Sequence, residues 1–119
     1  MRESYYQVMF ILSNVEVRSL NIEDILRIKA MISDELDYFY NRIQECEHSK
    51  WILLSKKEKI MKDQVENGMN DFHEQELRNI AEELNRFKAE KHFLVKKINK
   101  LEVKNKQFLS DFLKKLDVE

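Results

Sequence analysis

In EKHFLVKKINKLEVKNKQFLSDF, residues 90–112, apolar side chains return every three or four positions. That spacing places them on one stripe of an α-helix. Extended in both directions, the stripe alternates steps of three and four and contains Leu77, Ile80, Leu84, Phe87, Lys91, Leu94, Ile98, Leu101, Asn105, Phe108, Phe112 and Lys115. The second half of the chain is therefore predicted to be one long helix whose apolar seam needs a partner.

The first half of the chain carries a second seam with the same spacing. Its members are Ile22, Ile25, Lys29, Ile32, Leu36, Phe39, Ile43, Cys46, Lys50, Leu53, Lys57 and Ile60, followed by the polar residues Gln64 and Asn67. The sequence NGMND, residues 67–71, separates the two seams. Gly68 can close a helix in the left-handed conformation, and Asp71 stands three residues before Glu74, which is the spacing of a capping box. Asn21 is predicted to cap the first helix.

These signals predict an all-α fold, a long antiparallel two-helix coiled-coil hairpin with a short N-terminal extension. The hairpin is expected over residues 21–119, with helix one at about 21–67, a turn at about 67–71 and helix two at about 72–116. Folding the chain at Gly68 pairs residues whose numbers add to about 137. In that register Lys91 lies opposite Cys46 and Asn105 lies opposite Ile32, so no polar seam residue faces another. Two copies pairing in antiparallel fashion would satisfy the same seams.

The charges agree with this register. The lysines of residues 88–106 run beside a stretch that holds Asp34, Glu35, Asp37, Glu45 and Glu47, and nearer the turn Lys56, Lys57, Lys59 and Lys62 face Glu74, Glu76, Glu82 and Glu83. Single exposed ion pairs are weak, but a pattern of this kind can select the orientation in which two helices pair.

Residues 1–20 do not continue the seam. They hold a cluster of apolar side chains: Tyr5, Tyr6, Val8, Met9, Phe10, Ile11 and Leu12. The pattern is compatible with a short helix laid on the hairpin, with a strand that pairs between molecules, or with an extended tail. The sequence does not choose among these three forms.

Composition excludes several classes of function. Lys and Arg number 21 against 22 Asp and Glu, so no overall field attracts nucleic acid, and no segment is long and apolar enough to span a membrane. The single cysteine, Cys46, forms no internal disulfide and suits a cytoplasmic location. Cys46 and His48 point to different faces of a helix, and the chain has one glycine for a phosphate-binding loop. We expect no metal, no cofactor and no enzymatic activity.

Several apolar residues lie off the seam: Tyr38, Tyr40, Trp51, Leu54, Met61, Val65, Phe93 and Val95. They have two interpretations. The seam can shift locally near Trp51 and bury some of them. Otherwise they contact partner proteins. Tyr38, Tyr40, Trp51, Leu54 and Met61 are the predicted partner-binding residues.

The run ILRIKAMISDELDYFYNRIQECEHSK, residues 25–50, resembles the opening helix of the FliJ and YscO stalk proteins of flagellar and virulence type III secretion. Leu26, Arg27, Ile28 and Lys29 carry the match. The two charged helices and the turn at mid-chain are also similar to that family, so the resemblance covers about residues 22–116. The chain departs from the family in its N-terminal extension of 20 residues.

The resemblance implies a non-enzymatic central stalk that links a hexameric secretion ATPase to the cytoplasmic domain of the export gate and also meets secretion chaperones. It implies a cytoplasmic location, peripheral to the inner-membrane apparatus. By this resemblance, the residues that enter the ATPase would be Arg27, Lys29, Phe112, Lys114 and Lys115. The residues available to the gate would be Trp51, Leu54 and Met61.

Two other functions are compatible with the sequence. The first is a small helical chaperone or adaptor that binds an amphipathic segment of a partner. The second is a structural coiled coil that associates with itself through residues 1–20. Stoichiometry separates them from a stalk, which binds as a monomer to one ATPase ring.

Overall fold

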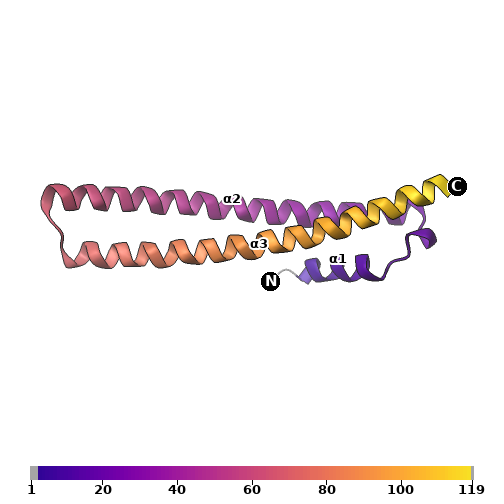
Figure 1. The fold of residues 1–119 in the computed structure, drawn as a ribbon, viewed down its shortest axis with the longest axis horizontal. Coiled ribbons are helices and arrows are strands. Elements are labelled where there is room, and N and C mark those ends of the chain that lie inside the picture. The colour runs from indigo at the N-terminus through magenta and orange to yellow at the C-terminus, as the bar shows by residue number, and fades with distance from the viewer. Residues whose placement is uncertain (1–2, 119) are drawn as a thin grey trace. The chain divides into compact units, whose positions relative to one another are not determined.

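The structure, a computed structural model, describes residues 3–118. In chain order it contains helix α1 (Glu3–Asn14), a short 3-10 helix η1 (Val17–Ser19), helix α2 (Ile22–Asn67) and helix α3 (Asp71–Val118) (Figure 1). No strand occurs among residues 3–118. Helices α2 and α3 have 46 and 48 residues and form the long helical hairpin that the two seams predict.

The helix ends follow local side-chain chemistry. At the start of α2 the Asn21 side-chain oxygen accepts a hydrogen bond of 2.9 Å from the backbone N–H of Asp24, as a capping residue does. At the end of α2, Gly68 has a φ of 83°, and its backbone N–H donates to the carbonyl of Gln64 at 2.9 Å. Glycine reaches this left-handed conformation without the strain that a Cβ atom brings, so Gly68 closes α2 as predicted.

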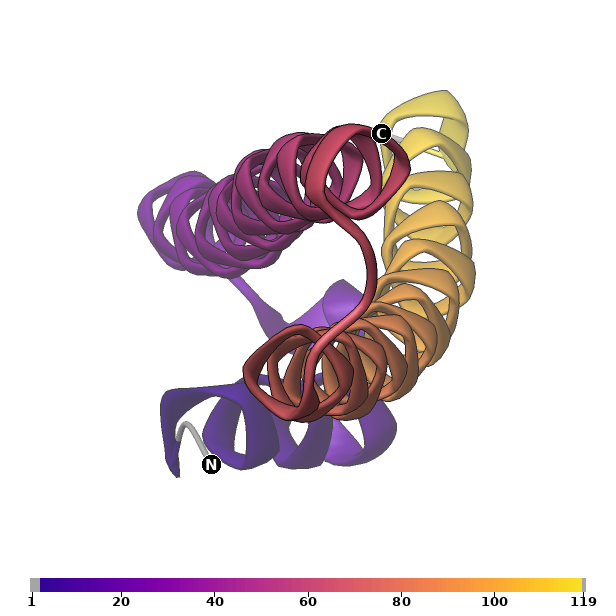
Figure 2. The same cartoon turned by 90° about the vertical axis from the view of Figure 1, so that its left-hand side faces the viewer.

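The start of α3 differs from the prediction. The capping residue is Asn70, whose side-chain oxygen accepts a hydrogen bond of 2.8 Å from the backbone N–H of His73. Asp71 is already the first residue of α3. The predicted cap at Asp71 is therefore wrong by one position, because Asn70 offers an equally short acceptor one residue earlier. Figure 2 shows the short connection between the ends of α2 and α3.

The chain forms two compact units, which we describe separately. Unit 1 comprises residues 1–40 and 95–119, and unit 2 comprises residues 41–94. In unit 1 the core combines buried side chains from three helices. They are Tyr5 and Val8 of α1, Ile25, Ile28, Ile32 and Phe39 of α2, and Ile98, Leu101 and Phe108 of α3.

Helix α1 packs on the hairpin helices within unit 1. The ring of Tyr5 meets the ring of Phe39 edge to face, with 5.5 Å between their centroids, and the ammonium of Lys97 lies 4.8 Å from the centroid of Tyr5. Burial of Tyr5 raises the pKa of its hydroxyl, and the neighbouring Tyr6 adds to the rise. Of the three forms open to the N-terminal segment, residues 3–14 adopt the short helix laid on the hairpin.

The presence of α1 explains where the seam of α2 departs from the prediction. Ile28 is buried in place of Lys29, Glu35 is buried beside half-buried Leu36, and Ile22 is exposed. In unit 1, α2 packs against α1 as well as α3, so its buried stripe is wider than the seam of a two-helix hairpin.

Unit 2 contains the turn and a two-helix core. Cys46 and Leu53 of α2 and Ile80 and Leu94 of α3 are buried. Three side-chain contacts cross between the helices: Lys91 with Glu47, His73 with Asp63, and Arg42 with Glu90. In the first two, the residue numbers add to within one of 137, which is the register that the sequence predicts, and in the third they add to 132.

Candidate protein-interaction surfaces

An exposed apolar stripe runs along α2 in unit 2. Its members follow one another at steps of three or four residues, so they share one face of the helix. They are the apolar residues Trp51, Leu54, Met61 and Val65, with Glu58 in the middle of the series. Trp51 is 66% exposed and Val65 is 88% exposed. We call Trp51, Leu54, Glu58, Met61 and Val65 the outer stripe.

The core of unit 2 does not include this stripe. Cys46 and Leu53 remain buried on the face of α2 that packs against α3, while Trp51 between them is mostly exposed. The alternative in which the seam shifts near Trp51 is therefore wrong. The outer stripe is therefore not part of the core of unit 2 and remains exposed, which makes it a candidate surface for protein contact.

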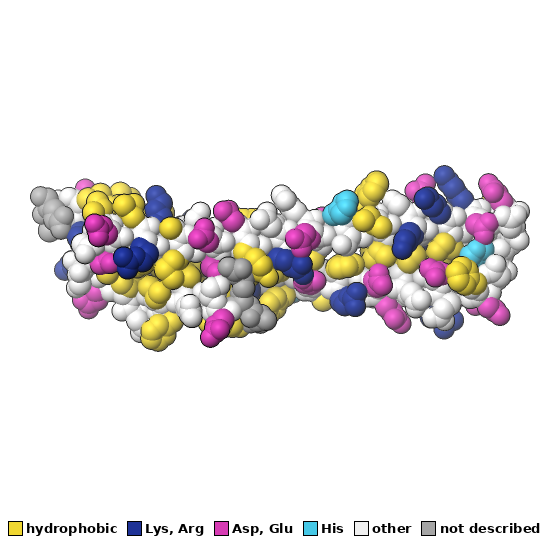
Figure 3. All heavy atoms as spheres, turned by 180° about the vertical axis from the view of Figure 1, so that it is seen from behind, with side chains coloured by type: hydrophobic (Ala, Val, Ile, Leu, Met, Phe, Trp, Pro, Cys, Tyr) yellow, Lys and Arg dark blue, Asp and Glu magenta, His cyan; other side chains and the backbone are white. Residues whose placement is uncertain are grey.

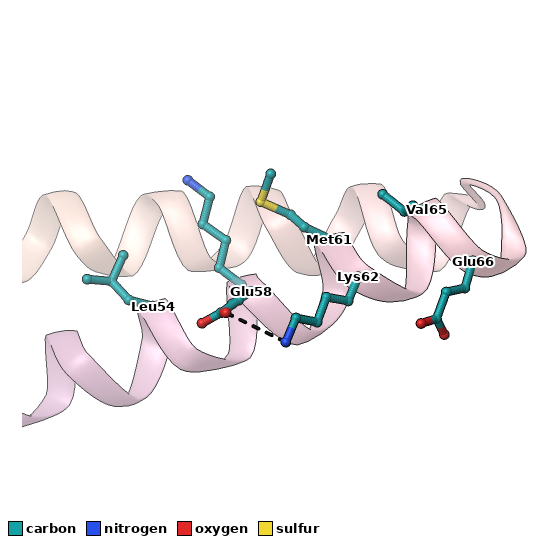
Figure 4. A pocket seen from close by; sticks show the side chains of 7 residues that line it. Leu54, Glu58, Met61, Lys62, Val65 and Glu66 are labelled. Atoms are coloured by element: carbon teal, nitrogen blue, oxygen red, sulfur yellow. Dashed lines mark ion pairs between the residues drawn. The ribbon is translucent and has the colours of Figure 1, made fainter.

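A groove follows the outer stripe at the end nearest the turn. Leu54, Met61 and Val65 provide its apolar lining, and Figure 4 shows Met61 and Val65 on one side of α2 with Lys62 and Glu66 on the other. Its volume is about 420 Å³, and all of its lining residues belong to α2. Its other lining residues are charged, namely Lys57, Glu58, Lys62 and Glu66. An opening of this kind can receive the apolar side chains of an amphipathic helix.

Lysines border the outer stripe. Lys62 forms an ion pair of 3.8 Å with Glu58, one turn earlier on the same helix. Among the residues that the structure describes, Lys50 and Lys57 have no ion-pair partner. In the same part of the chain, Lys56, Lys57, Lys59 and Lys62 make no ion pair with the carboxylates of α3 that they were predicted to face.

Farther from the turn, unit 2 does show the predicted pairing of charges between α2 and α3. Lys91 donates to the carboxylate of Glu47 at 2.5 Å, which lowers the pKa of Glu47. Arg42 donates to Glu90 and, at 2.6 Å, to Glu45, and these bonds raise the pKa of its guanidinium. Burial, followed by the charge of Glu90, raises the pKa of the Cys46 thiol. The ion pairs of Lys91 and Arg42 thus join α2 and α3 within unit 2.

A further contact of unit 2 lies beside the turn and had no signal in the sequence. His73 is buried, and its Nε2 lies 2.6 Å from the carboxylate of Asp63, while its Nδ1 is buried with no hydrogen-bond partner among the described residues. His73 lies on α3 and Asp63 on α2, so the contact closes the hairpin next to the turn.

The residues predicted to enter an ATPase all lie in unit 1. Arg27, Lys29 and Lys114 are exposed, and Arg27 is 3.9 Å from the carboxylate of Asp24. Phe112 is half-buried. Lys115 is held within the chain, because its ammonium donates to the backbone carbonyl of Leu20 and, at 3.4 Å, to that of Val17. Lys115 thus positions the connection between α1 and α2.

Two of the predicted partner-binding residues also belong to unit 1. The hydroxyl of Tyr40 donates to the carboxylate of Glu102 at 2.5 Å, and this hydrogen bond raises the pKa of the hydroxyl. Tyr38 is half-buried, with its ring edge-to-face on Phe39 at 5.6 Å. Trp51, Leu54 and Met61 are brought together on the outer stripe, and Tyr38 and Tyr40 take part in contacts of unit 1.

The sequence analysis did not predict the exposure of several other apolar residues. In unit 1 these include Ile22, Leu26, Leu113 and Leu116 near the ends of α2 and α3, and Phe10 on α1. Figure 3 shows one face of the molecule, on which hydrophobic side chains reach the surface between charged ones. The seam pattern predicts that Ile22 is buried, and the structure shows instead that it is exposed.

Comparisons of the chain with protein-family models, with curated proteins and with solved structures gave no match. The described residues contain no group of three or more His, Cys, Asp and Glu side chains that could hold a metal ion. Within residues 3–118, no helix has the length and apolar character needed to cross a membrane.

Proposed function

We propose that this protein acts by binding other proteins along its helical hairpin, as a central stalk of a bacterial type III secretion apparatus, and that no reaction takes place on the chain. One observation carries the proposal: the outer stripe leaves Trp51, Leu54, Met61 and Val65 exposed on a hairpin whose core is formed by other residues. Large exposed apolar side chains on one helix face mark a site of protein contact.

The assignment to a stalk is supported by the resemblance of residues 25–50 to the FliJ and YscO proteins and by the length of the two helices, 46 and 48 residues. In this role unit 1 contacts the hexameric secretion ATPase through Arg27, Lys29 and Lys114, and the outer stripe contacts the export gate. A rod that touches the subunits of a ring unequally favours different nucleotide states in them.

The test uses the purified full-length chain and a purified hexameric secretion ATPase. We expect one chain to bind per ring and the rate of ATP hydrolysis to change on binding. Replacing Arg27 and Lys114 by Glu should weaken binding, because both side chains are exposed in unit 1 and available to a partner. Lys106→Glu is the matched control, since Lys106 is an exposed lysine of α3 outside the predicted site. Absence of both binding and altered hydrolysis would refute the stalk.

A second function is favoured by the groove on α2. A helical adaptor or chaperone binds an amphipathic segment of a partner, and the groove lined by Leu54, Met61 and Val65 can receive the apolar side chains of such a segment. The mass of the complex distinguishes the two functions. An adaptor binds its cargo in a ratio of one or two chains to one, without any ATPase ring.

A further inference from the structure

The outer stripe has the spacing of a second coiled-coil seam. Residues 51, 54, 58, 61 and 65 alternate steps of three and four, and the stripe runs for roughly 15 residues, or about 22 Å at the helical rise. A seam of this kind is completed by another helix that inserts its own apolar side chains between those of the first. The groove beside Met61 and Val65 is one such insertion point.

The residues that flank the stripe indicate the charge of the missing helix. Lys50 and Lys57 directly precede the seam positions 51 and 58 and lie along one edge, and Lys62 directly follows position 61 and lies along the other. Glu58, inside the stripe, pairs with Lys62. Lys57 has no ion-pair partner in the part of the chain that is described, whereas the charge of Lys50 helps to lower the pKa of Glu47, one turn earlier on α2. A partner with carboxylates on both sides of its seam would complement these edges.

A second copy of the chain fits this stripe poorly. In an antiparallel pair, the edge with Lys50 and Lys57 faces the same edge of the other copy. In a parallel pair, that edge faces the edge with Lys62. Lysines face lysines in either arrangement, and like charges placed opposite each other oppose association.

We propose that the outer stripe is the docking site of an amphipathic helix from a partner protein, with an apolar seam and Asp or Glu on both flanks. This inference rests on one part of the proposed function, which is that the chain acts by binding proteins. It does not depend on the stalk role. It adds the class of partner: an acidic helix of about four turns, the length that matches the stripe. The apolar seam supplies the contact area, and the lysine edges select acidic partners and exclude basic ones.

Trp51 provides the measurement, because it is the single tryptophan of the chain and is 66% exposed. The probe is a synthetic helical peptide of about 18 residues with Leu at the seam positions and Glu at the flanking positions. A second peptide with Lys in place of each Glu is the matched probe. We expect the acidic peptide to shift Trp51 emission to shorter wavelength in a saturable titration, with affinity at least about tenfold above that of the basic peptide. Raising the salt concentration should narrow the difference.

Variants of the full-length chain test the two parts of the site. Met61→Glu places a charge in the apolar seam and should abolish the Trp51 shift. Lys57→Glu combined with Lys62→Glu should reverse the preference, so that the basic peptide binds better than the acidic one. Val103→Glu and Lys106→Glu are matched controls on α3, because Val103 and Lys106 are exposed and lie in unit 1. Circular dichroism of each variant verifies that the helices remain.

Three outcomes would overturn the proposal. The first is equal affinity for the acidic and basic peptides, and the second is an unchanged Trp51 spectrum with both. The third is a spectral shift that depends on protein concentration alone and accompanies a doubled mass in light scattering, which would identify a second copy as the occupant. Binding of the acidic peptide without any effect on the ATPase would refute the stalk and leave this docking site in place. An effect on the ATPase without binding of the acidic peptide would refute the docking site and leave the stalk in place.

Discussion

At the scale of single residues, the contacts between α2 and α3 combine burial with charge. Cys46 is buried in the core of unit 2, and Glu47, the next residue, is exposed and pairs with Lys91. The same turn of α2 therefore contributes an apolar contact and an ionic one. Exposed ion pairs contribute little to stability one at a time, so the apolar contacts hold unit 2 together and the charges fix its register.

The pair of Glu47 and Lys91 predicts a dependence of stability on pH. Lys91 holds the pKa of Glu47 below its ordinary value of 4.5, so the pair stabilises the folded chain above pH 4.5. This contribution is lost as the pH falls through the lowered pKa of the folded state. Lys91→Met should therefore be less stable than the natural chain near neutral pH and equal to it in strong acid. Urea unfolding at a series of pH values measures the difference.

Lys96→Met is the control for that series, because Lys96 is exposed and makes no ion pair within residues 3–118. A difference between Lys91→Met and the natural chain that persists unchanged in strong acid would contradict the assignment to Glu47.

The cap of α3 predicts a second effect at this scale. Asn70→Ala removes the acceptor for the backbone N–H of His73 and should lower the free energy of unfolding by about 1 kcal/mol. Asn70→Asp keeps an acceptor of the same length and should retain most of the stability. Thermal unfolding followed by circular dichroism compares the two. Equal stability of Asn70→Ala and Asn70→Asp would show that the cap lies elsewhere.

At the scale of elements, α1 turns part of the hairpin into a three-helix core. Its inner face carries Tyr5 and Val8, both buried, and Phe10 is exposed. Tyr6 is 50% exposed, and its ring centroid lies 5.2 Å from the ammonium of Lys97 on α3. Lys115 of α3 donates to the backbone carbonyls of Val17 and Leu20 and so secures the connection to α2. Helix α1 is therefore bound at its inner face and at its end.

Tyr5 tests the packing of α1. Tyr5 is 3% exposed, so Tyr5→Ala removes a buried ring and should cost about 3 kcal/mol or release α1 from unit 1. Tyr6→Ala is the matched control, since Tyr6 is 50% exposed and should cost much less. Hydrogen exchange at the amides of residues 3–14 reports the release, and denaturant unfolding reports the cost. Equal losses from the two substitutions would contradict the packing described for α1.

The sequence predicts these elements unevenly, for physical reasons. Repeated apolar spacing and a single glycine predict two long helices and the register in which they pair, although pairing between two copies would satisfy the same seams. The cap at Asn70 could not, because Asn70 and Asp71 are both good capping residues in adjacent positions. The burial of Ile28 and Glu35 could not either, because the seam describes a two-helix hairpin alone and the apolar cluster of residues 1–20 is compatible with several structures.

At the scale of the whole molecule, α2 and α3 each contribute to both compact units. The predicted surface residues divide between the units, with Trp51, Leu54 and Met61 in unit 2 and Arg27, Lys29, Phe112, Lys114 and Lys115 in unit 1. Heptad spacing could locate the outer stripe in the sequence, including Val65. It could not show that the stripe is exposed, because the same spacing also describes a core.

The alkylation rate of Cys46 reports how often unit 2 opens. Cys46 is 4% exposed, and burial raises its pKa above the ordinary value of 9.0, so the folded chain holds little thiolate near neutral pH. Alkylation should be slow in native buffer and should accelerate in denaturant in parallel with loss of helix. The raised pKa also means that the neutral thiol stabilises unit 2 below pH 9.0 and that this contribution is lost as the pH rises through the folded value.

A variant with Cys46→Ser and His48→Cys is the control, because position 48 is exposed and its thiol should react at once. Rapid alkylation of Cys46 in native buffer would show that unit 2 opens without global unfolding.

The turn also affects the rate at which Asn67 deamidates. Asn67 precedes Gly68, and in unfolded chains an asparagine before glycine deamidates readily, because the glycine backbone nitrogen attacks the side-chain amide. Here that nitrogen donates to the carbonyl of Gln64, and the Asn67 amide donates to the carboxylate of Asp63 at 2.6 Å. Both reacting groups are engaged in helix-ending hydrogen bonds. The fold thus protects the Asn67 side-chain amide from deamidation, and accumulation of isoaspartate at position 67 would measure how often the end of α2 unfolds.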